Sequence, residues 1–344
     1  MSDMQLIEVD LTSGHEFTAL IRALSVHAPC SLHILGGVLN SRERTEKFDG
    51  ADPSKVCAWS SEPLNSIINP SSALFSVLIF SPVSHQFRFF CSAESFPGLP
   101  TEEEQAHVVG MMQSLLHLAL AEGPKYDSAL KPVRALEAPA ERKQDERAMI
   151  VVGAVHEKWQ SCLHTLAAAQ NPCVRYVQPP APSDTPTPSD DFSDKWVVSH
   201  IQESDIDTVR ATSHIPRSKE YLLSRSAHSV CIRGRDEGGE AQKAVAWALM
   251  HTDGSIGTLY VDKEHRRKGF AQVVIKELVR KLDFKKGNGP SSNDDDLGGG
   301  ALGWNWTEVD VWNDKGRGFF DSFPGWHLGW LCHWTYMNVG SEAT

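Results

Sequence analysis

The stretch GSIGTLYVDKEHRRKGFAQVVIKELVRKL, residues 254–282, points most directly to the fold. A run typical of a β-strand reaches three basic residues and one glycine, and an amphipathic helix is predicted directly afterwards. The apolar residues of this helix recur every three or four positions and share one face: Phe270, Val273, Val274, Leu278, Val279 and Leu282. Cations at a helix start oppose the positive end of the helix macrodipole. We therefore expect an anionic ligand at this turn.

The turn RRKGFA, residues 266–271, has the features of a phosphate-binding loop. The first backbone N–H groups of a helix have no partner inside the helix, so they attract phosphate or pyrophosphate. Gly269 can take a positive φ angle, and Ala271 keeps the first helical turn clear of large side chains. The positive charge comes from three consecutive residues: Arg266, Arg267 and Lys268. The alternative is a solvated basic turn, and the strand before it and the helix after it favour the phosphate site.

The composition predicts a soluble protein with two domains. The chain has 344 residues, too many for one ordinary core, and its 41% apolar and 22% charged residues are close to the globular average. No apolar run is long enough to cross a bilayer. Residues 1–17 lack the patterns of a secretory signal or an organellar transit peptide, so we expect a cytoplasmic location, with the nucleus as the alternative.

Net charge and cysteine content exclude several kinds of partner. A formal net charge of −11 argues against a general affinity for nucleic acid or for anionic membranes. The seven cysteines are odd in number, and no two of them form a Cys-x-x-Cys pair. Neither a disulfide framework nor a metal site is therefore predicted.

Two low-complexity segments interrupt the chain. Residues 178–194, QPPAPSDTPTPSDDFSD, hold five prolines and predict an extended, solvated linker. Residues 285–303, KKGNGPSSNDDDLGGGALG, have little to bury and predict a mobile surface loop. The linker separates a predicted N-terminal α/β domain, residues 1–177, from a second domain, residues 195–344, that contains the loop.

The first domain has strand and helix patterns without a phosphate loop or a catalytic signature. Residues 75–94 predict a hairpin with a Ser-Pro turn. Residues 101–121 predict a helix that begins with a capping box formed by Thr101 and Glu104. Residues 148–168 repeat a strand-then-helix pattern.

The second domain predicts the element order β-α-α-β-β-β-α-loop-β-α-β. Its first helix is predicted to have Ser204 as its N-cap. The Asp253-Gly254 pair indicates the hairpin that leads into the opening stretch. The segments after the Gly-rich loop predict a strand, a helix and a Trp-rich strand in turn: residues 304–312, 313–323 and 325–339.

These features resemble the GNAT superfamily of acyl-CoA N-acyltransferases. The pyrophosphate loop of that superfamily has the form Gln/Arg-x-x-Gly-x-Gly/Ala, which is matched by Arg266, Gly269 and Ala271. The resemblance covers residues 195–339. The loop segment, with IPRSKEYLLSR ahead of it, is similar to the glycine N-acyltransferase-like and FR47-like branch.

The resemblance implies a mixed α/β fold with a largely antiparallel central sheet flanked by helices. Residues 1–177 would form a degenerate half of related fold. The implied activity is an acyl-CoA-dependent N-acyltransfer, in which the primary amine of a small molecule or amino acid attacks the thioester directly. Acetyl-CoA or another acyl-CoA is the implied co-substrate, and no metal is implied.

The resemblance also implies the site residues. Those that would contact the cofactor are Leu259, Tyr260, Val261, Arg266, Arg267, Lys268, Gly269, Phe270, Ala271, Asn313 and Phe320. Two positions depart from the family. Phe320 stands where many members have a tyrosine that protonates the leaving thiolate, and Ser255 stands where some members have a glutamate. A backbone N–H at a bulge around residues 259–261 could stabilise the oxyanion.

Several side chains are candidates for the base that an ammonium substrate requires. Glu308 and Asp310 share a strand face with tryptophans, which could raise a carboxylate pKa by desolvation. The alternative is an edge strand with solvated acids. Further candidates lie at the hairpin: His251, Asp253 and Ser255. His327 and His333 could line an amine pocket or be structural, and the tryptophans of residues 304–334 could form an acyl-chain wall or a core.

Three alternative functions remain open from the sequence. A protein N-acetyltransferase is a close variant of the small-molecule enzyme. A non-catalytic acyl-CoA-binding module would keep the loop without turnover. The first half could also be an interaction domain that presents the second.

Overall fold

The computed structural model describes residues 4–45, 56–68, 74–126, 136–137, 149–180, 195–213, 215, 217–235, 241–284 and 299–339. The chain divides into two compact units. The first unit comprises residues 1–177, 308–322 and 326–344, and the second comprises residues 178–307 and 323–325. No helix of the described residues is long and apolar enough to cross a membrane.

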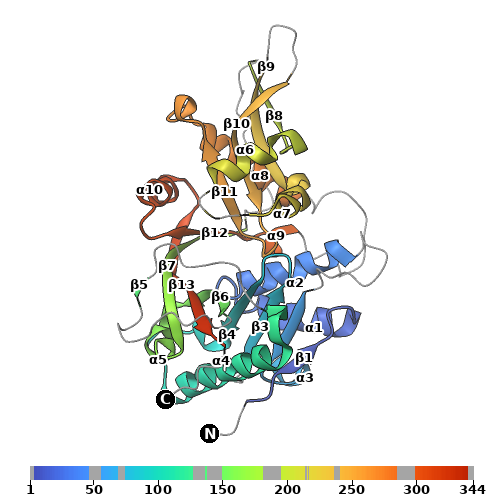
Figure 1. Cartoon of the computed structure of the whole chain (residues 1–344), viewed down its shortest axis with the longest axis vertical. Coiled ribbons are helices and arrows are strands. Elements are labelled where there is room, and N and C mark those ends of the chain that lie inside the picture. Colours follow the sequence, from blue (N-terminus) through green and yellow to red (C-terminus); the bar gives the residue numbers. More distant parts are fainter. Residues whose placement is uncertain are drawn as a thin grey trace. The chain divides into compact units, whose positions relative to one another are not determined.

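The first unit is built on a sheet that has nine strands in the described residues, in the order β1-β2-β3-β4-β6-β13-β7-β12, with β5 also paired to β7 (Figure 1). The strands are β1 (Ile7–Val9), β2 (Cys57–Ser60), β3 (Ser76–Ser81), β4 (Gln86–Cys91), β5 (Leu136–Glu137), β6 (Met149–His156), β7 (Ala167–Gln178), β12 (Asn305–Asp310) and β13 (His327–Asn338). β4 and β6 run parallel, whereas β3–β4, β6–β13 and β13–β7 are antiparallel. The sheet is therefore mixed and largely antiparallel, and the predicted fold class is confirmed.

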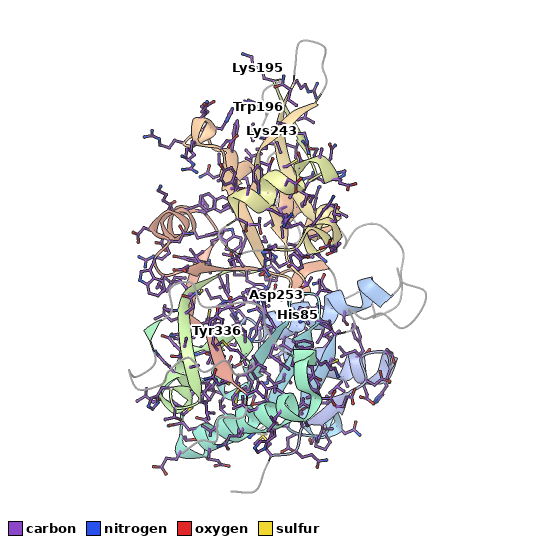
Figure 2. The ribbon with its side chains drawn as sticks, in the orientation of Figure 1. His85, Lys195, Trp196, Lys243, Asp253 and Tyr336 are labelled. Atoms are coloured by element: carbon purple, nitrogen blue, oxygen red, sulfur yellow. The ribbon has the colours of Figure 1, made fainter. Side chains whose placement is uncertain are left out.

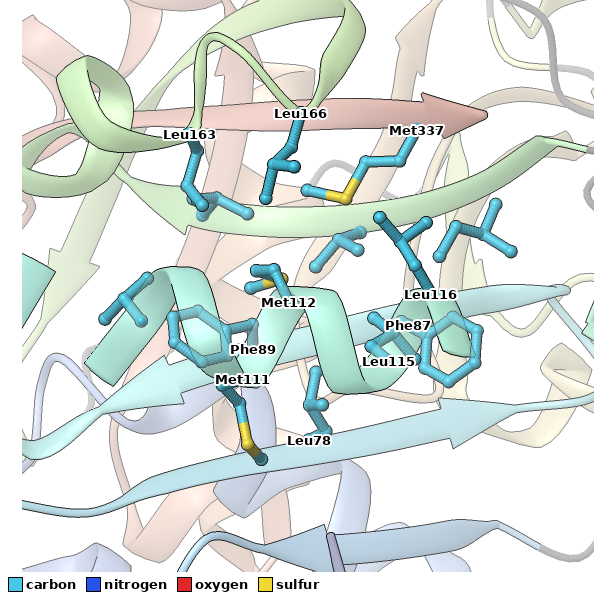
Figure 3. Close-up of a cluster of buried hydrophobic side chains, with 14 of the residues drawn as sticks. Leu78, Phe87, Phe89, Met111, Met112, Leu115, Leu116, Leu163, Leu166 and Met337 are labelled. Carbon is cyan, nitrogen blue, oxygen red and sulfur yellow. The ribbon is translucent and has the colours of Figure 1, made fainter. Parts of the chain in front are cut away.

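Helices cover both faces of this sheet because its strands are apolar on both sides. The helices of the unit are α1 (Gly14–Ser25), α2 (Leu32–Thr45), α3 (Leu64–Ile67), α4 (Glu102–Glu122), α5 (Gln160–Leu163) and α10 (Asp314–Ser322). One face packs against α4 through buried side chains that include Leu78, Phe87, Phe89, Met111, Met112 and Leu115 (Figure 3). Ile79 points to the opposite face, where Gly37 of α2 lies directly against it.

The last strand of the chain lies inside the sheet of the first unit. β13 is hydrogen-bonded to β6 on one side and to β7 on the other. Cys332 thus lies opposite His156 of β6 and opposite Cys173 of β7. Figure 1 shows the red strand β13 beside the green strand β7.

This pairing divides the region that the sequence predicts as one domain, residues 195–344. Residues 308–322 and 326–344 group with the first unit. The physical reason is that the backbone hydrogen bonds of β13 are made to strands that precede the linker. The remainder of the region forms the second unit.

The second unit has a four-stranded antiparallel sheet in the order β11-β10-β9-β8. Its elements are β8 (Trp196–Ser199), α6 (Ile206–Thr212), α7 (Lys219–Ser224), β9 (Ser229–Arg235), β10 (Ala241–Met250), β11 (Ile256–Val261), α8 (Phe270–Phe284) and α9 (Gly299–Leu302). α8 is the predicted amphipathic helix, and it buries Phe270, Val274, Ile275 and Leu278. β11 leads into α8 through the basic turn.

Local sequence signals are mostly confirmed. The hairpin of residues 75–94 is present as β3 and β4. The capping box is also present, since Glu104 N–H donates to Thr101 Oγ1 at 3.2 Å and Thr101 N–H donates to Glu104 Oε2 at 2.7 Å. Of the predicted linker and Gly-rich loop, residues 181–194 and 285–298 lie outside the described residues.

The prediction that Ser204 caps the first helix of the second half is wrong. Ser204 lies within a 3-10 turn, residues 203–205, that precedes α6. The turn is closed by Gln202 N–H, which donates to Asp205 Oδ2 at 2.8 Å. The Asp205 carboxylate is held in this position by a buried ion pair with Arg233 of β9.

Candidate functional site

β11 is the edge strand of the second unit's sheet and carries a bulge. Trp247 of β10 pairs with Tyr260, and Leu249 pairs with Gly257, so three steps along β11 face two along β10. Thr258 lies within the bulge and has a left-handed φ of 54°. A bulge leaves backbone groups outside the ladder. The bulge lies one residue before the segment in which the sequence analysis placed an oxyanion donor.

All three cations of the basic turn after β11 are exposed, and one of them is bonded to the backbone of the strand. Arg266 folds back, and its Nε donates to the carbonyl of Val261 at 3.0 Å. Arg267 and Lys268 are exposed. Neither side chain has an ion-pair or hydrogen-bond partner within the described part of the chain. The charge available to a ligand therefore comes from these two residues, while Arg266 fixes the end of the strand.

The backbone of the turn forms a concave row of donors at the start of α8. Arg267 and Gly269 both have left-handed backbone angles, with φ of 62° and 82°. The first helical hydrogen bond runs from Val273 N–H to the carbonyl of Gly269. Among the described residues, no group accepts from the N–H groups of Ala271 and Gln272. Alternating left-handed residues before a helix make a geometry that can bind an anion.

An aromatic cluster holds the turn against the unit. The rings of His265 and Phe270 stack with centroids 5.7 Å apart, and Trp196 packs edge-on against them at 5.3 and 4.8 Å (Figure 2 labels Trp196). Phe270 is buried, so the helix start is anchored from inside. Trp196 was not singled out from the sequence, because nothing local connects it with residues 265–270.

The hairpin before β11 brings a histidine to the bulge. His251 Nδ1 lies 2.7 Å from the hydroxyl of Tyr221 of α7, and its Nε2 lies 3.5 Å from Thr258 Oγ1. Ser255, another residue of this hairpin, takes part in the turn, and its catalytic role stays a prediction. It is buried, and its hydroxyl donates to Asp253 Oδ1 at 2.6 Å, which closes the turn (Asp253 is labelled in Figure 2).

Residues 234–291 match the FR47-like protein family. This segment contains β10, the bulged strand β11, the basic turn and all of α8. No curated protein matches the chain.

Several solved structures are similar to the chain at low sequence identity. A Drosophila protein studied by X-ray crystallography is 11% identical with a TM-score of 0.60, and the match covers 99% of this chain and all of that one. A tandem GNAT protein from the clavulanic acid biosynthesis pathway is 9% identical with a TM-score of 0.47, covering 98% of this chain and 99% of that one. A GCN5-related N-acetyltransferase from Sphaerobacter thermophilus is 14% identical with a TM-score of 0.40, covering 87% and 85%. The Drosophila structure shows that this fold occurs over the full length of another chain.

Glu308, the first candidate base, lies in a buried charge cluster of the first unit. Its carboxylate forms an ion pair with Arg175, and Arg88 Nη1 lies 3.7 Å from it. The indole N–H of Trp334 donates to its second oxygen at 3.0 Å. Arg175 also bonds to His33 Nδ1 at 3.0 Å. These contacts give the Glu308 carboxylate a structural role in the first unit, and its role as a base stays a prediction.

The other expected residues of this region also belong to the first unit. Asp310 accepts from the N–H of Trp312 at 2.8 Å. Asn313 caps α10, since its Oδ1 accepts from Gly316 N–H at 3.0 Å. Phe320 is buried and stacks on Tyr176 with ring centroids 5.5 Å apart.

The two late histidines differ in exposure. His327 is exposed at the start of β13, whereas His333 is buried and its pKa is lowered by desolvation. Of the late tryptophans, Trp306 and Trp326 are buried, as a core role requires, and Trp312 is exposed; the acyl-chain wall stays a prediction. Within the described ranges, no group of three or more metal-ligating side chains occurs.

Proposed function

We propose that this chain is an acyl-CoA-dependent N-acyltransferase of the glycine N-acyltransferase-like kind. The observation that carries the proposal is the turn between β11 and α8, where Arg267 and Gly269 are left-handed and three consecutive cations are exposed. Such a turn costs stability without an anion and is favourable with one. Acetyl-CoA is the co-substrate that we expect, and the acceptor is the primary amine of a small molecule or amino acid.

The edge strand supports coenzyme A over a simple phosphate. β11 offers unpaired backbone groups along one side and leads directly into the turn. Extended ligands with amide groups bind such edges by adding to the sheet. The pantetheine arm has two amides and ends in the thioester. It would run from the turn along residues 259–261 toward the bulge at Thr258, where a backbone N–H can stabilise the oxyanion.

The corresponding turn of the first unit, at the start of α4, lacks these features. α4 follows β4 as α8 follows β11, but its first turn holds three glutamates: Glu102, Glu103 and Glu104. Its capping box also occupies an N–H group that an anion would need. We therefore propose one coenzyme A per chain.

Calorimetry with coenzyme A tests the phosphate assignment. Reversal of charge in Arg267→Glu and introduction of a carboxylate in Gly269→Asp should each weaken binding by about tenfold or more, because charge-assisted hydrogen bonds contribute about 1.5–3 kcal/mol. Asp tolerates left-handed angles, so Gly269→Asp should still fold. The control is Arg210→Glu, an exposed charge reversal on α6. Unchanged affinity in both turn variants, or a stoichiometry of two, would contradict the proposal.

A non-catalytic acyl-CoA-binding module is the second candidate. It is favoured by Phe320, which cannot donate a proton, and by Glu308, whose carboxylate is engaged by Arg175. Thiol release from acetyl-CoA in the presence of glycine, n-butylamine and benzylamine separates the two functions. Tight binding without thiol release at any pH supports the module.

A further inference from the structure

His251 directly follows β10, and hydrogen bonds fix both its side chain and its backbone. Its Nδ1 is 2.7 Å from the hydroxyl of Tyr221, and the two rings stack with centroids 5.9 Å apart. Its backbone N–H donates to the carbonyl of Ser255 at 2.7 Å across the hairpin. Tyr221 is buried with 3% exposure, and the imidazole is half-buried. The imidazole is therefore held by Tyr221 of α7, and the backbone of His251 is held by the hairpin.

The other ring nitrogen lies against the bulged strand. Nε2 is 3.5 Å from Thr258 Oγ1, the residue with the left-handed φ at the bulge. A Cβ at Gly257 would be 2.5 Å from Nε2, so only glycine lets the ring approach the strand this closely. One side chain thus reaches the point where the strand's backbone leaves its ladder.

The elements that flank the imidazole carry charged side chains, among them Arg217, Arg225 and Asp253. The guanidinium of Arg217 lies 5.0 Å from the ring of Tyr221, and Arg225 Nε donates to the carbonyl of Met250 at 2.9 Å. Asp253 of the turn accepts from the N–H and the hydroxyl of Ser255. Arg217 thus contacts the ring face of Tyr221, and Arg225 bonds to a backbone carbonyl. The carboxylate of Asp253 accepts hydrogen bonds within the turn.

We infer that His251 is the general base of the proposed acyltransfer, with Tyr221 as its positioning residue. In this role Nδ1–H donates to the Tyr221 oxygen, and the lone pair of Nε2 faces the bulge. A neutral imidazole has an ordinary pKa of about 6.5, which suits a base at neutral pH. This inference rests on the proposed function and names a residue for it.

The step is balanced without a further reactant. Nε2 takes one proton from the alkylammonium acceptor, and the resulting amine attacks the thioester carbonyl carbon. A C–N bond forms and the C–S bond breaks. The second proton of the attacking nitrogen goes to the departing thiolate, which gives an amide and free thiol, and His251 returns its proton to water.

The test compares pH profiles of kcat/KM, with acetyl-CoA and the same three amines, for the wild type, His251→Gln, Tyr221→Phe and Gly257→Ala. We expect His251→Gln to lower kcat by about a hundredfold or more and to abolish the fall in rate below the histidine pKa. Its acetyl-CoA affinity should stay within about twofold. Gly257→Ala should reproduce the loss, because its methyl group displaces the imidazole. The control is His200→Gln, an exposed histidine of the same unit.

Nitrogen-15 NMR of labelled histidine gives a readout without turnover. Nε2 of His251 should be unprotonated in the neutral ring, and Tyr221→Phe should shift this tautomer balance and the acid limb of the rate profile. An active His251→Gln with an unchanged pH profile overturns the role of His251 and leaves the transferase standing. A wild type that binds acetyl-CoA and releases no thiol overturns both together.

Discussion

Glu94 is a buried carboxyl group in a 3-10 turn of the first unit, residues 92–95. Burial raises its pKa to about 8 from an ordinary value of 4.5, and hydrogen bonds from the Trp159 indole and the Cys91 N–H lower it only in part. The native state therefore holds this proton more strongly than the unfolded chain. The resulting stabilisation is complete below pH 4.5 and is lost as the pH rises from 4.5 through 8.

We predict that this carboxyl group makes the protein less stable at mildly alkaline pH. The urea midpoint of the wild type should fall between about pH 5 and about pH 8, whereas that of Glu94→Gln should fall less, because the amide stays neutral and still accepts from Trp159. The control is Glu103→Gln, an exposed glutamate of the same unit. Equal slopes for the wild type and Glu94→Gln would contradict the prediction.

The partners of Glu308 could not be predicted from the sequence. Alternation along the strand predicts tryptophans of the same strand beside Glu308, whereas the indole that bonds to it belongs to Trp334 of β13. The strongest partner of Glu308, Arg175, lies 133 positions away, and no local pattern connects the two. The sequence could predict that Glu308 lies on a strand. It could not predict that the carboxylate pairs with guanidinium groups from distant parts of the chain.

The start of α4 is the clearest case of an element defined by its own sequence. Thr101→Ala removes the acceptor of the Glu104 N–H and should lower the free energy of unfolding by about 1 kcal/mol. Ser204→Ala serves as the matched control, and it should change stability by less than about 0.5 kcal/mol, because Gln202 and Asp205 close that turn. Urea unfolding followed by circular dichroism measures both. A larger loss in Ser204→Ala than in Thr101→Ala would contradict this assignment.

Elements with local signals were therefore predictable, and those decided by tertiary contacts were not. The hairpin of residues 75–94 and helix α8 follow from periodicity within a few residues. Ser204 had an equally good local signal, but Asp205 is held by Arg233 from another strand and sets the turn instead. The pairing of Tyr221 with His251 spans 30 positions and had no signal either.

At the scale of the whole molecule, the first unit depends on a strand from the other end of the chain. The tryptophan-rich pattern of residues 325–339 predicts a strand but does not name its neighbours. β13 fills the space between β6 and β7 with hydrogen bonds on both sides. A fragment of residues 1–180 would expose both edges and their apolar side chains, which favours aggregation.

We predict that two fragments, residues 1–180 and 195–344, form a soluble one-to-one complex when they are co-expressed, and that the first alone is insoluble. Size-exclusion chromatography with light scattering measures the outcome. A second fragment that ends at residue 326 lacks β13 and should fail to rescue the first. Cooperative folding of residues 1–180 alone would contradict the prediction.

The position of β13 also sets the order of events during synthesis on the ribosome. Translation delivers chains from the N-terminus at about 5–20 residues per second, and domains usually fold as they emerge. Here β6 and β7 leave the exit tunnel long before the strand that must separate them. The nascent first half has to wait for residues 327–338, so chaperones should hold it until they emerge, and a chain that stops before β13 should go to a protease.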